Sequence, residues 1–260
     1  MPDGNGGARP LSYLEAGDGE TPVLLVHGNF AGKSWWRELL GDPVPGARLV
    51  APDLPGFGAS TIYGSLEPSV AFYAGGLLNF IDGLGLERPL LVGHSFGGAV
   101  VTELALTDPE RFPGMLLLNS ASPTGLHTPG YLYPVLESYL QDRRGLRRSL
   151  RRLIHTQNPA YLDELVDEAR MMHPAGFSGN ARALSGWDVS DLTRRYTNPV
   201  LATSGDRDTL APPSAARRTA GAFPQGRYVH LGDVGHSPQI ESPVLVWSLL
   251  LRFLRETGQE

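Results

Sequence analysis

The sequence predicts a doubly wound α/β domain with a helical insertion, and three observations support that prediction. Short aliphatic runs alternate with segments of helical periodicity, as in a parallel sheet covered on both faces. This alternation stops between residues 124 and 196, where we find only helical patterns. The chain of 260 residues is 41% hydrophobic and 19% charged, which is the composition of a globular protein long enough to bury a large core.

Six short runs predict buried strands, because each is mostly aliphatic and is bounded by Gly, Pro, Asp or Ser. These runs are residues 23–26, 48–51, 90–92, 115–118, 200–203 and 227–231. Residues 9–15 alternate more strongly between polar and apolar, which is typical of an antiparallel edge strand. Helices are expected between the strands, at residues 34–40, 69–84, 98–106, 213–222 and 243–256. The order of strands and helices predicts a mostly parallel, doubly wound sheet.

The helical insertion, residues 124–196, is expected to form a cap over the sheet. Its apolar residues recur at helical spacing in two stretches, Leu132, Val135, Leu136, Tyr139 and Leu140, and then Leu162, Leu165, Val166 and Ala169. We therefore predict a core domain made of residues 1–123 and 197–260, with residues 124–196 as a separate helical cap.

The insertion also carries six arginines at helical spacing, which form a basic stripe: Arg143, Arg144, Arg147, Arg148, Arg151 and Arg152. One interpretation is a surface that binds an anionic partner or a membrane. The other, which we favour, is a solvated helix face paired with nearby acids. Those acids are Asp142, Asp163, Glu164, Asp167 and Glu168.

Composition excludes several classes of function. The chain has no cysteine, so disulfides, thiolate metal sites and a cysteine nucleophile are excluded. No apolar run reaches the roughly 18 residues of a membrane-spanning helix, and the net charge of -5 argues against nucleic acid as a partner. Residues 1–10 lack the cationic start and apolar run of a signal peptide. We therefore expect a cytoplasmic protein.

The strongest local signal is the run GHSFGG at residues 93–98, which has the pattern G-x-S-x-G between a predicted strand and a predicted helix. Such a turn is too tight for side chains at Gly93 and Gly97, and it lifts the serine hydroxyl above the sheet. The N–H of Phe96 lies at the helix start, where it can stabilise an oxyanion. The pattern predicts Ser95 as a nucleophile. Taken alone it does not exclude a non-catalytic serine, because a Gly-rich turn with no function in catalysis can have the same local sequence.

A serine nucleophile needs a base, and the base needs an orienting acid. His236 lies in a loop after the last predicted strand, at the sheet edge where doubly wound folds place their sites. Asp206 and Asp208 both follow the strand at 200–203 and compete for the role of the acid. Asp233 is too close to His236 along one loop for a straight hydrogen bond. We choose Asp208, and expect Asp206 to cap the turn or hold its loop.

A second oxyanion donor should come from a loop after another strand. The run HGNF at residues 27–30 follows the predicted strand 23–26, and Gly28 lets the backbone turn so that the next amides point into the site. Asn29 is our first choice for this amide and Phe30 the second. The same region, GNFAGKS, looks like a phosphate-binding loop. It has three residues between its glycines rather than four, which argues against nucleotide binding.

The order of serine, acid and histidine and five motifs together resemble the α/β-hydrolase superfamily over nearly the whole chain. The motifs are HGNF at 27–30, APDLPGFGAS at 51–60, GHSFGG at 93–98, SGDRD at 204–208 and GHSPQIESP at 235–243. The resemblance implies the α/β-hydrolase fold, an acid at Asp208, and a cap formed by the insertion. It also implies that the loop with Asp53 borders the pocket. Phe30 stands where the commoner form of the first motif has proline.

The expected reaction is hydrolysis of a carboxylic ester through an acyl-enzyme, with Ser95, His236 and Asp208 as the triad and the amides of Asn29 and Phe96 as the oxyanion hole. It requires no metal and no cofactor, and the partner is a small-molecule ester or lactone. A lactonase is the closest alternative. A C–C bond hydrolase or a cofactor-free perhydrolase can use the same triad, and a non-catalytic receptor can share the fold.

The substrate pocket is expected under the insertion. Its apolar lining is predicted to include Phe30, Trp35, Trp36, Leu126, Tyr131 and Trp187. Packing in the core would explain each of these side chains about as well. Relatives that act on epoxides or haloalkanes carry aspartate at the elbow, so Ser95 argues against those substrates.

Overall fold

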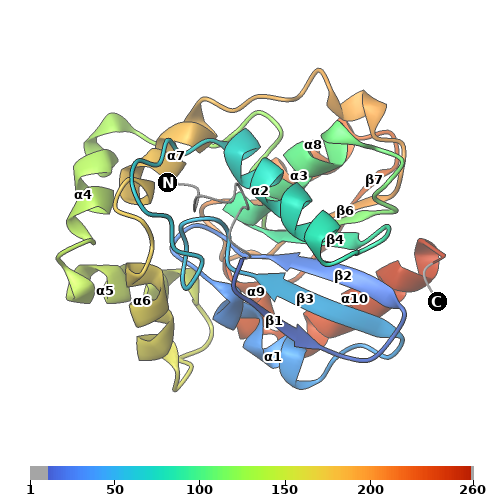
Figure 1. Ribbon diagram of the computed structural model, residues 1–260, viewed down its shortest axis with the longest axis horizontal. Coiled ribbons are helices and arrows are strands. Elements are labelled where there is room, and N and C mark those ends of the chain that lie inside the picture. The colour runs from blue at the N-terminus through green and yellow to red at the C-terminus, as the bar shows by residue number, and fades with distance from the viewer. Residues whose placement is uncertain (1–10, 259–260) are drawn as a thin grey trace.

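The computed structural model describes residues 11–258 and contains a seven-stranded sheet in this part of the chain (Figure 1). The strands are β1 (Tyr13–Ala16), β2 (Thr21–Val26), β3 (Ala47–Pro52), β4 (Leu90–His94), β5 (Met115–Leu118), β6 (Val200–Ser204) and β7 (Gly226–His230). The six runs expected to form buried strands are present, with ends shifted by no more than two residues, and the expected edge strand 9–15 corresponds to β1, which begins at Tyr13. Residues 1–10, where we expected no signal peptide and where the first strand was predicted to begin, lie outside the described residues.

The strand order is β1-β3-β2-β4-β5-β6-β7. β1 pairs with β3 in the antiparallel sense, and the other described pairs are parallel. The expectation of a doubly wound, mostly parallel sheet with an antiparallel edge strand is confirmed. Because the parallel strands point the same way, the residues that follow β2, β4, β5, β6 and β7 meet at one edge of the sheet.

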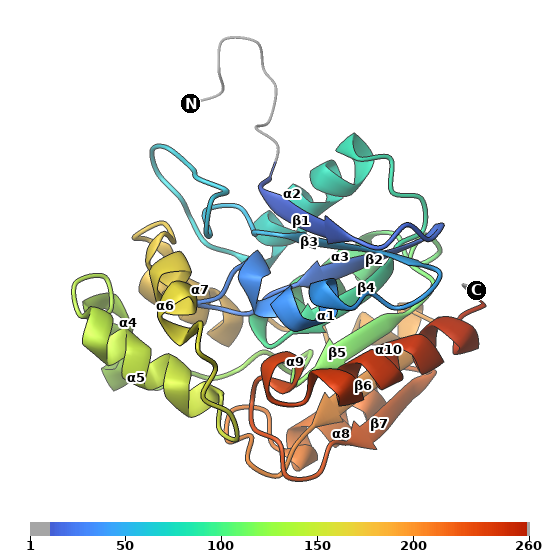
Figure 2. The same cartoon turned by 90° about the horizontal axis from the view of Figure 1, so that it is seen from below.

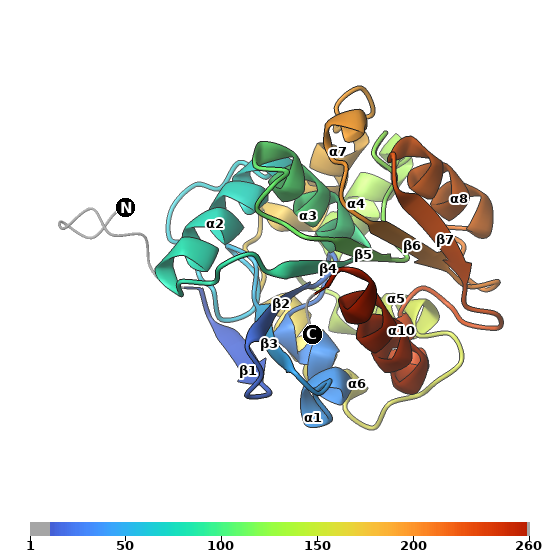
Figure 3. The same ribbon diagram turned by 90° about the vertical axis from the view of Figure 1, so that its right-hand side faces the viewer.

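Helices cover both faces of the sheet (Figure 3). One face carries α2 (Val70–Gly83), α3 (Phe96–Thr107) and α8 (Pro213–Ala222), and the other carries α1 (Arg37–Gly41) and α10 (Pro243–Glu256). α1 follows a short 3-10 turn at Lys33–Trp36, and the four-residue α9 (Pro238–Glu241) precedes α10. Among residues 11–258, no helix is both long and apolar enough to cross a membrane.

The strands divide their side chains between two apolar clusters. Leu24, Leu91 and Leu117 pack with α2 and α3 in the first cluster, while their neighbours along the strands, such as Leu25 and Val92, pack with α1 and α10 in the second. Alternation at a period of two produces this division, because successive side chains of a strand point to opposite faces. The strands are apolar throughout because both faces are covered.

The insertion forms α4 (Tyr133–Ser138), α5 (Arg143–Leu153), α6 (Leu162–Arg170) and α7 (Gly176–Ser185). These helices lie beyond one end of the strands, as Figures 1 and 2 show from two sides. α4 is shorter than the stretch 132–140 predicted: Leu132 belongs to a preceding 3-10 turn, Pro134 lies in the first turn of the helix, and the helix ends at Ser138. The treatment of residues 124–196 as a separate domain stays a prediction.

The arginine stripe is partly paired with acids. On α5, Arg143 donates to both Asp163 and Asp167 of α6, and Arg147 donates to Asp163. Arg148 lies 3.7 Å from Asp142. Two of the expected partners do something else and were wrongly assigned: the side chain of Glu164 pairs with Arg37, and that of Glu168 accepts a hydrogen bond from Ser34. Both hold the insertion against the core.

We predict that truncating Phe253 of α10 weakens the fold strongly. Its ring is fully buried in the second cluster, so Phe253→Ala leaves a cavity and should lower the free energy of unfolding by about 3–5 kcal/mol. Urea denaturation followed by circular dichroism measures this change. Val244, on the same helix but 76% exposed, provides the control, because Val244→Ala should change stability by no more than about 0.5 kcal/mol. Equal effects would show that the buried face of α10 is misassigned.

Candidate active site

Ser95 lies in a tight turn between β4 and α3. Its φ of 54° is in the left-handed region that non-glycine residues rarely adopt. A Cβ added to Gly97 would lie 2.4 Å from the carbonyl oxygens of Val26 and His27, and one at Gly93 would lie 2.6 Å from the carbonyl oxygen of Gly97. Both positions therefore require glycine. The turn leaves Ser95 partly exposed, whereas its neighbours are buried.

The structure brings Ser95, His236 and Asp208 together from three separate loops. The hydroxyl oxygen of Ser95 lies 2.8 Å from Nε2 of His236. Nδ1 of the same imidazole lies 3.0 and 2.9 Å from the two carboxylate oxygens of Asp208. A carboxylate only accepts hydrogen bonds, so Nδ1 carries the proton and Nε2 presents its lone pair to the serine.

The carboxylate of Asp208 is buried but well supplied with donors. It accepts hydrogen bonds from the backbone N–H groups of Leu210 and Ala211 and from Nδ2 of Asn119 at 2.9 Å. Burial alone would raise the pKa of Asp208, but attraction to the imidazole of His236, the hydrogen bond with it, and those from the N–H groups of Leu210 and Ala211 lower this pKa below its ordinary value. The group is therefore held as an anion facing the imidazole.

Asn119 links the acid to the histidine loop, and the sequence-based reasoning missed it. It follows β5 with a left-handed φ of 46°, and the same Nδ2 that contacts Asp208 also donates to the carbonyl oxygen of Gly235 at 2.9 Å. Its place at the carboxyl end of a parallel strand was the available signal.

A buried glutamate, Glu241 of α9, holds the loop that carries His236. Its carboxylate accepts the N–H of Gly235 and the N–H of Ser237, each at 3.0 Å. It also accepts hydrogen bonds from the N–H and the hydroxyl of Thr156, at 2.9 and 2.8 Å. The residues on either side of His236 are thus fixed to one carboxylate, which also binds the insertion.

His94 packs beside the imidazole of His236 as a neutral group. Its Nε2 donates to the backbone carbonyl of His236 at 2.8 Å, and its ring stacks with Trp35 at 6.1 Å. Burial, and then repulsion from His236, lowers the pKa of His94 to about 3. It therefore supports the histidine loop without adding a second positive charge.

Two backbone N–H groups beside Ser95 are free to bind an oxyanion. A Cβ built on Gly28 would lie 3.1 Å from Cβ of Ser95, so the loop after β2 passes directly beside the serine. Within residues 11–258, no group accepts a hydrogen bond from the N–H of Asn29 or of Phe96. The N–H of Phe30, our second choice, is instead donated to Oδ1 of Asn29 at 3.1 Å.

Hydrogen bonds tie the loop after β2 to the loop after β3. Nε2 of buried His27 accepts the N–H of Leu54 at 3.0 Å. Asp53, fully buried, accepts the N–H of Ala59 at 2.9 Å and the N–H of Lys33 at 2.8 Å, and it pairs with the Lys33 ammonium. These contacts brace the Asn29 segment against the sheet.

The aromatic residues expected in the pocket lie in different parts of the structure. Phe30 lies beside Tyr139 and Phe177, with ring centroids 5.8 and 5.6 Å apart. Trp35 is buried in the first cluster. Trp36 is fully buried in the second, on the opposite face of the sheet, so it does not reach Ser95 and its assignment is corrected.

The other expected lining residues belong to the insertion. Leu126 is half-buried against the first cluster, and Nε1 of Trp187 donates to Glu103 of α3 at 2.8 Å. Tyr131 is 76% exposed, so its side chain lies mainly in solvent. Of this set, Phe30 is the residue that immediately adjoins the loop beside Ser95.

The competing acids have other partners. Oδ1 of Asp206 lies 2.8 Å from Nε2 of His230, and Asp233 pairs with Arg207 through both oxygens. Both are exposed, and neither shares a hydrogen bond with the imidazole of His236. In the described part of the chain, no three His, Asp or Glu side chains are grouped so that they could hold a metal ion.

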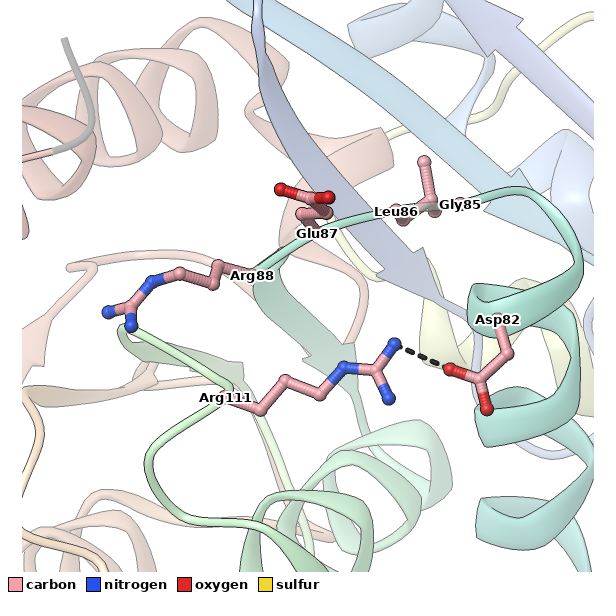
Figure 4. Close-up of a pocket in the computed structure, with 6 residues that line it drawn as sticks. All are labelled: Asp82, Gly85, Leu86, Glu87, Arg88 and Arg111. Carbon is pink, nitrogen blue, oxygen red and sulfur yellow. Dashed lines mark hydrogen bonds and ion pairs between the residues drawn. The ribbon is translucent and has the colours of Figure 1, made fainter.

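A surface hollow of about 420 Å³ lies at the other end of β4 (Figure 4). Arg88, just before the strand, and Arg111 line it, and Arg111 pairs with Asp82. Ser95 follows the carboxyl end of the same strand, so this hollow takes no part in the site. Its lining contains the Arg111–Asp82 ion pair and no serine, threonine or histidine.

Comparison with known proteins places the chain in a family. The family model of the alpha/beta hydrolase fold matches residues 21–243. The chain is 26% identical to 2-hydroxy-6-oxo-6-phenylhexa-2,4-dienoate hydrolase of Comamonas testosteroni, over 95% of this chain and 91% of that protein. It is 25% identical to the pimeloyl-[acyl-carrier protein] methyl ester esterase of Yersinia pseudotuberculosis, over 95% and 98% of the two chains.

Solved structures share the fold. The enol-lactonase from Burkholderia xenovorans LB400 superposes with a TM-score of 0.83 at 23% identity, over 94% of this chain and 96% of that one. The resemblance that the motifs indicated is confirmed. The family match covers most of the chain and both halves of the sheet, and the protein belongs to the alpha/beta hydrolase family.

Proposed function

We propose that the protein is a serine hydrolase of carboxylic esters, linear or cyclic, that acts through an acyl-enzyme intermediate. The observation that carries the proposal is the unbroken hydrogen-bonded line from Asp208 through His236 to Ser95. The relatives support the reaction class, since one is named as a methyl ester esterase. Membership of the family alone would not support a particular reaction, because the same fold serves many functions.

In the first half of the reaction, the hydroxyl of Ser95 attacks the ester carbonyl and Nε2 of His236 takes its proton. The carboxylate of Asp208 stabilises the imidazolium that forms and holds its Nδ1 proton in place. The negative charge that develops on the carbonyl oxygen is bound by the N–H groups of Asn29 and Phe96. Each such donor is worth about 3 kcal/mol in the transition state. His236 then protonates the alkoxide, and the alcohol leaves.

In the second half, a water molecule loses its proton to His236 and attacks the acyl-Ser95 carbonyl. The same two amides bind the second oxyanion, and its collapse releases the carboxylic acid and returns the proton to Ser95. A lactone would follow the same steps, with the alcohol retained on the acyl chain. Both halves use the substrate, water, these side chains and the two backbone N–H groups.

We predict that Ser95→Ala abolishes ester hydrolysis, because it removes the attacking oxygen. The wild type should release p-nitrophenol from p-nitrophenyl acetate and should be labelled once by a fluorophosphonate, at Ser95. The variant should show neither, with turnover lower by about 10⁶-fold. Full turnover in the alanine variant would assign the nucleophile elsewhere. Peptide mapping of the labelled protein provides an independent check.

We predict that Asp208→Asn lowers kcat by about 10⁴-fold, because an amide no longer fixes the imidazole tautomer that accepts the serine proton. Asp206→Asn is the matched control. It changes an aspartate two positions away that contacts His230 rather than His236, so kcat should stay within about twofold of the wild type. Steady-state kinetics on one ester compares the two variants. Similar, small losses in both would remove Asp208 from the triad.

A further inference from the structure

A chain of hydrogen bonds runs from the core, through the insertion, to the loop beside Ser95. The hydroxyl of Tyr73, on α2, donates to Oδ1 of Asn180, on α7, at 2.6 Å. Nδ2 of Asn180 then donates to Oδ1 of Asn29 at 2.9 Å. Oδ1 of Asn29 also accepts the N–H of Phe30. Tyr73 and Asn180 are both fully buried, and α2 and α7 are in contact.

The direction of each hydrogen bond in this chain is fixed by one group that can only donate. The N–H of Phe30 is a donor, so the Asn29 atom that faces it must be the carbonyl oxygen. That oxygen can only accept, so Asn180 must present its NH₂ group to it. The amide oxygen of Asn180 is then left for the hydroxyl of Tyr73. The amide orientations therefore follow from the network itself.

The end of this chain lies where the oxyanion is expected to bind. Oδ1 of Asn29 accepts a hydrogen bond from the N–H of Phe30, and Phe30 has a left-handed φ of 54°. A bulky residue keeps that conformation only where its surroundings hold it. The N–H of Phe30 is thus occupied, and the N–H of Asn29 remains for the oxyanion. The side chain of Asn29 is half-buried. Its amide oxygen binds the N–H of Phe30 within its own loop and Nδ2 of Asn180, so Asn180 is the contact that holds the amide from outside the loop.

We infer that Asn180 is a positioning residue, through which the helical insertion sets the geometry of the oxyanion hole. The inference rests on the proposed function, because it assigns the N–H of Asn29 as an oxyanion donor. Asn180 itself touches neither substrate nor the reacting atoms. It acts by holding the side chain of Asn29, and through it the Asn29–Phe30 backbone. The insertion thereby contributes to catalysis as well as covering the sheet.

We predict that Asn180→Ala lowers kcat by about ten- to a hundredfold and leaves KM within about twofold. Displacement of an oxyanion donor weakens binding of the transition state more than binding of the substrate. Asn29→Ala keeps its own backbone N–H but removes the oxygen that binds Asn180 and Phe30, so it should cause a loss of the same size. Steady-state kinetics on a p-nitrophenyl ester measures both, and circular dichroism checks the fold of each variant.

The double variant tests whether the two residues act as one unit. If they do, Asn29→Ala combined with Asn180→Ala should be no slower than the slower single variant. The affinity for an alkyl trifluoromethyl ketone, whose adduct with Ser95 carries an oxyanion, should fall by the same factor as kcat/KM. The parallel is expected because the adduct, like the transition state, is tetrahedral at carbon and places a charged oxygen in the oxyanion hole.

The matched control is Ser178→Ala on the same helix. Ser178 donates to Glu137 at 2.6 Å within the insertion and makes no hydrogen bond to the Asn29 loop, so kcat should stay within about twofold of the wild type. A kcat of Asn29→Ala within twofold of the wild type would overturn the inference. So would losses that multiply in the double variant. A kcat of folded Asn180→Ala within twofold of the wild type would overturn it as well. If Asn180→Ala does not fold, Asn180→Asp takes its place, because it keeps the size of the side chain but presents no NH₂ group to Asn29.

Failure of the proposed function would appear differently. In that case the wild type itself would neither hydrolyse esters nor react with a fluorophosphonate at Ser95, and the inference would fall with it. An active, labelled wild type whose Asn29→Ala variant is equally active would overturn the role of Asn180 alone.

Discussion

The hydrogen bond between Nδ1 of His236 and the buried carboxylate of Asp208 is the contact on which the proposed chemistry of the site depends. It fixes the imidazole tautomer, and only that tautomer leaves Nε2 able to accept the proton of Ser95. Burying the carboxylate as an anion costs free energy, and hydrogen bonds from Asn119 and from the backbone of its own loop offset this cost. The triad is therefore part of a larger polar network.

The parallel sheet makes that network possible. Ser95, Asn119, Asp208 and His236 follow four different strands, and because those strands run in the same direction their carboxyl ends place the four residues at one edge. Glu241 then ties the residues around His236 to Thr156 of the insertion. The site is thus held from two sides, by the sheet below and by the insertion beside it.

The sequence was most informative where local backbone geometry dictates residue type. Gly93 and Gly97 have no room for a side chain, so the elbow and Ser95 could be predicted, and the strands followed from their apolar runs. The division of two adjacent tryptophans was not predictable. Trp35 and Trp36 have the same chemistry, and the short 3-10 turn that holds them sends one to each face of the sheet.

Contacts between segments far apart in the sequence could not be predicted either. Asn119 binds Asp208 and Gly235 across 89 and 116 residues. Glu241 binds Thr156 of the insertion across 85 residues, and Asn180 reaches Asn29 across 151 residues. A single sequence carries no local pattern for such pairs, because an asparagine that closes a network has the same neighbours as one in solvent. The packing of the insertion on the sheet must be known before these residues acquire a role.

The most direct test of the central claim is whether esters of one acid share a covalent intermediate. Wild-type enzyme is given the methyl and the p-nitrophenyl ester of the same acid in water containing ethanol, and the ratio of ethyl ester to free acid is measured. If both substrates pass through the same acyl-Ser95, the ratio is identical for the two leaving groups, because ethanol and water compete for one species. A ratio that changes with the leaving group would mean that water attacks the ester directly, and would contradict the account.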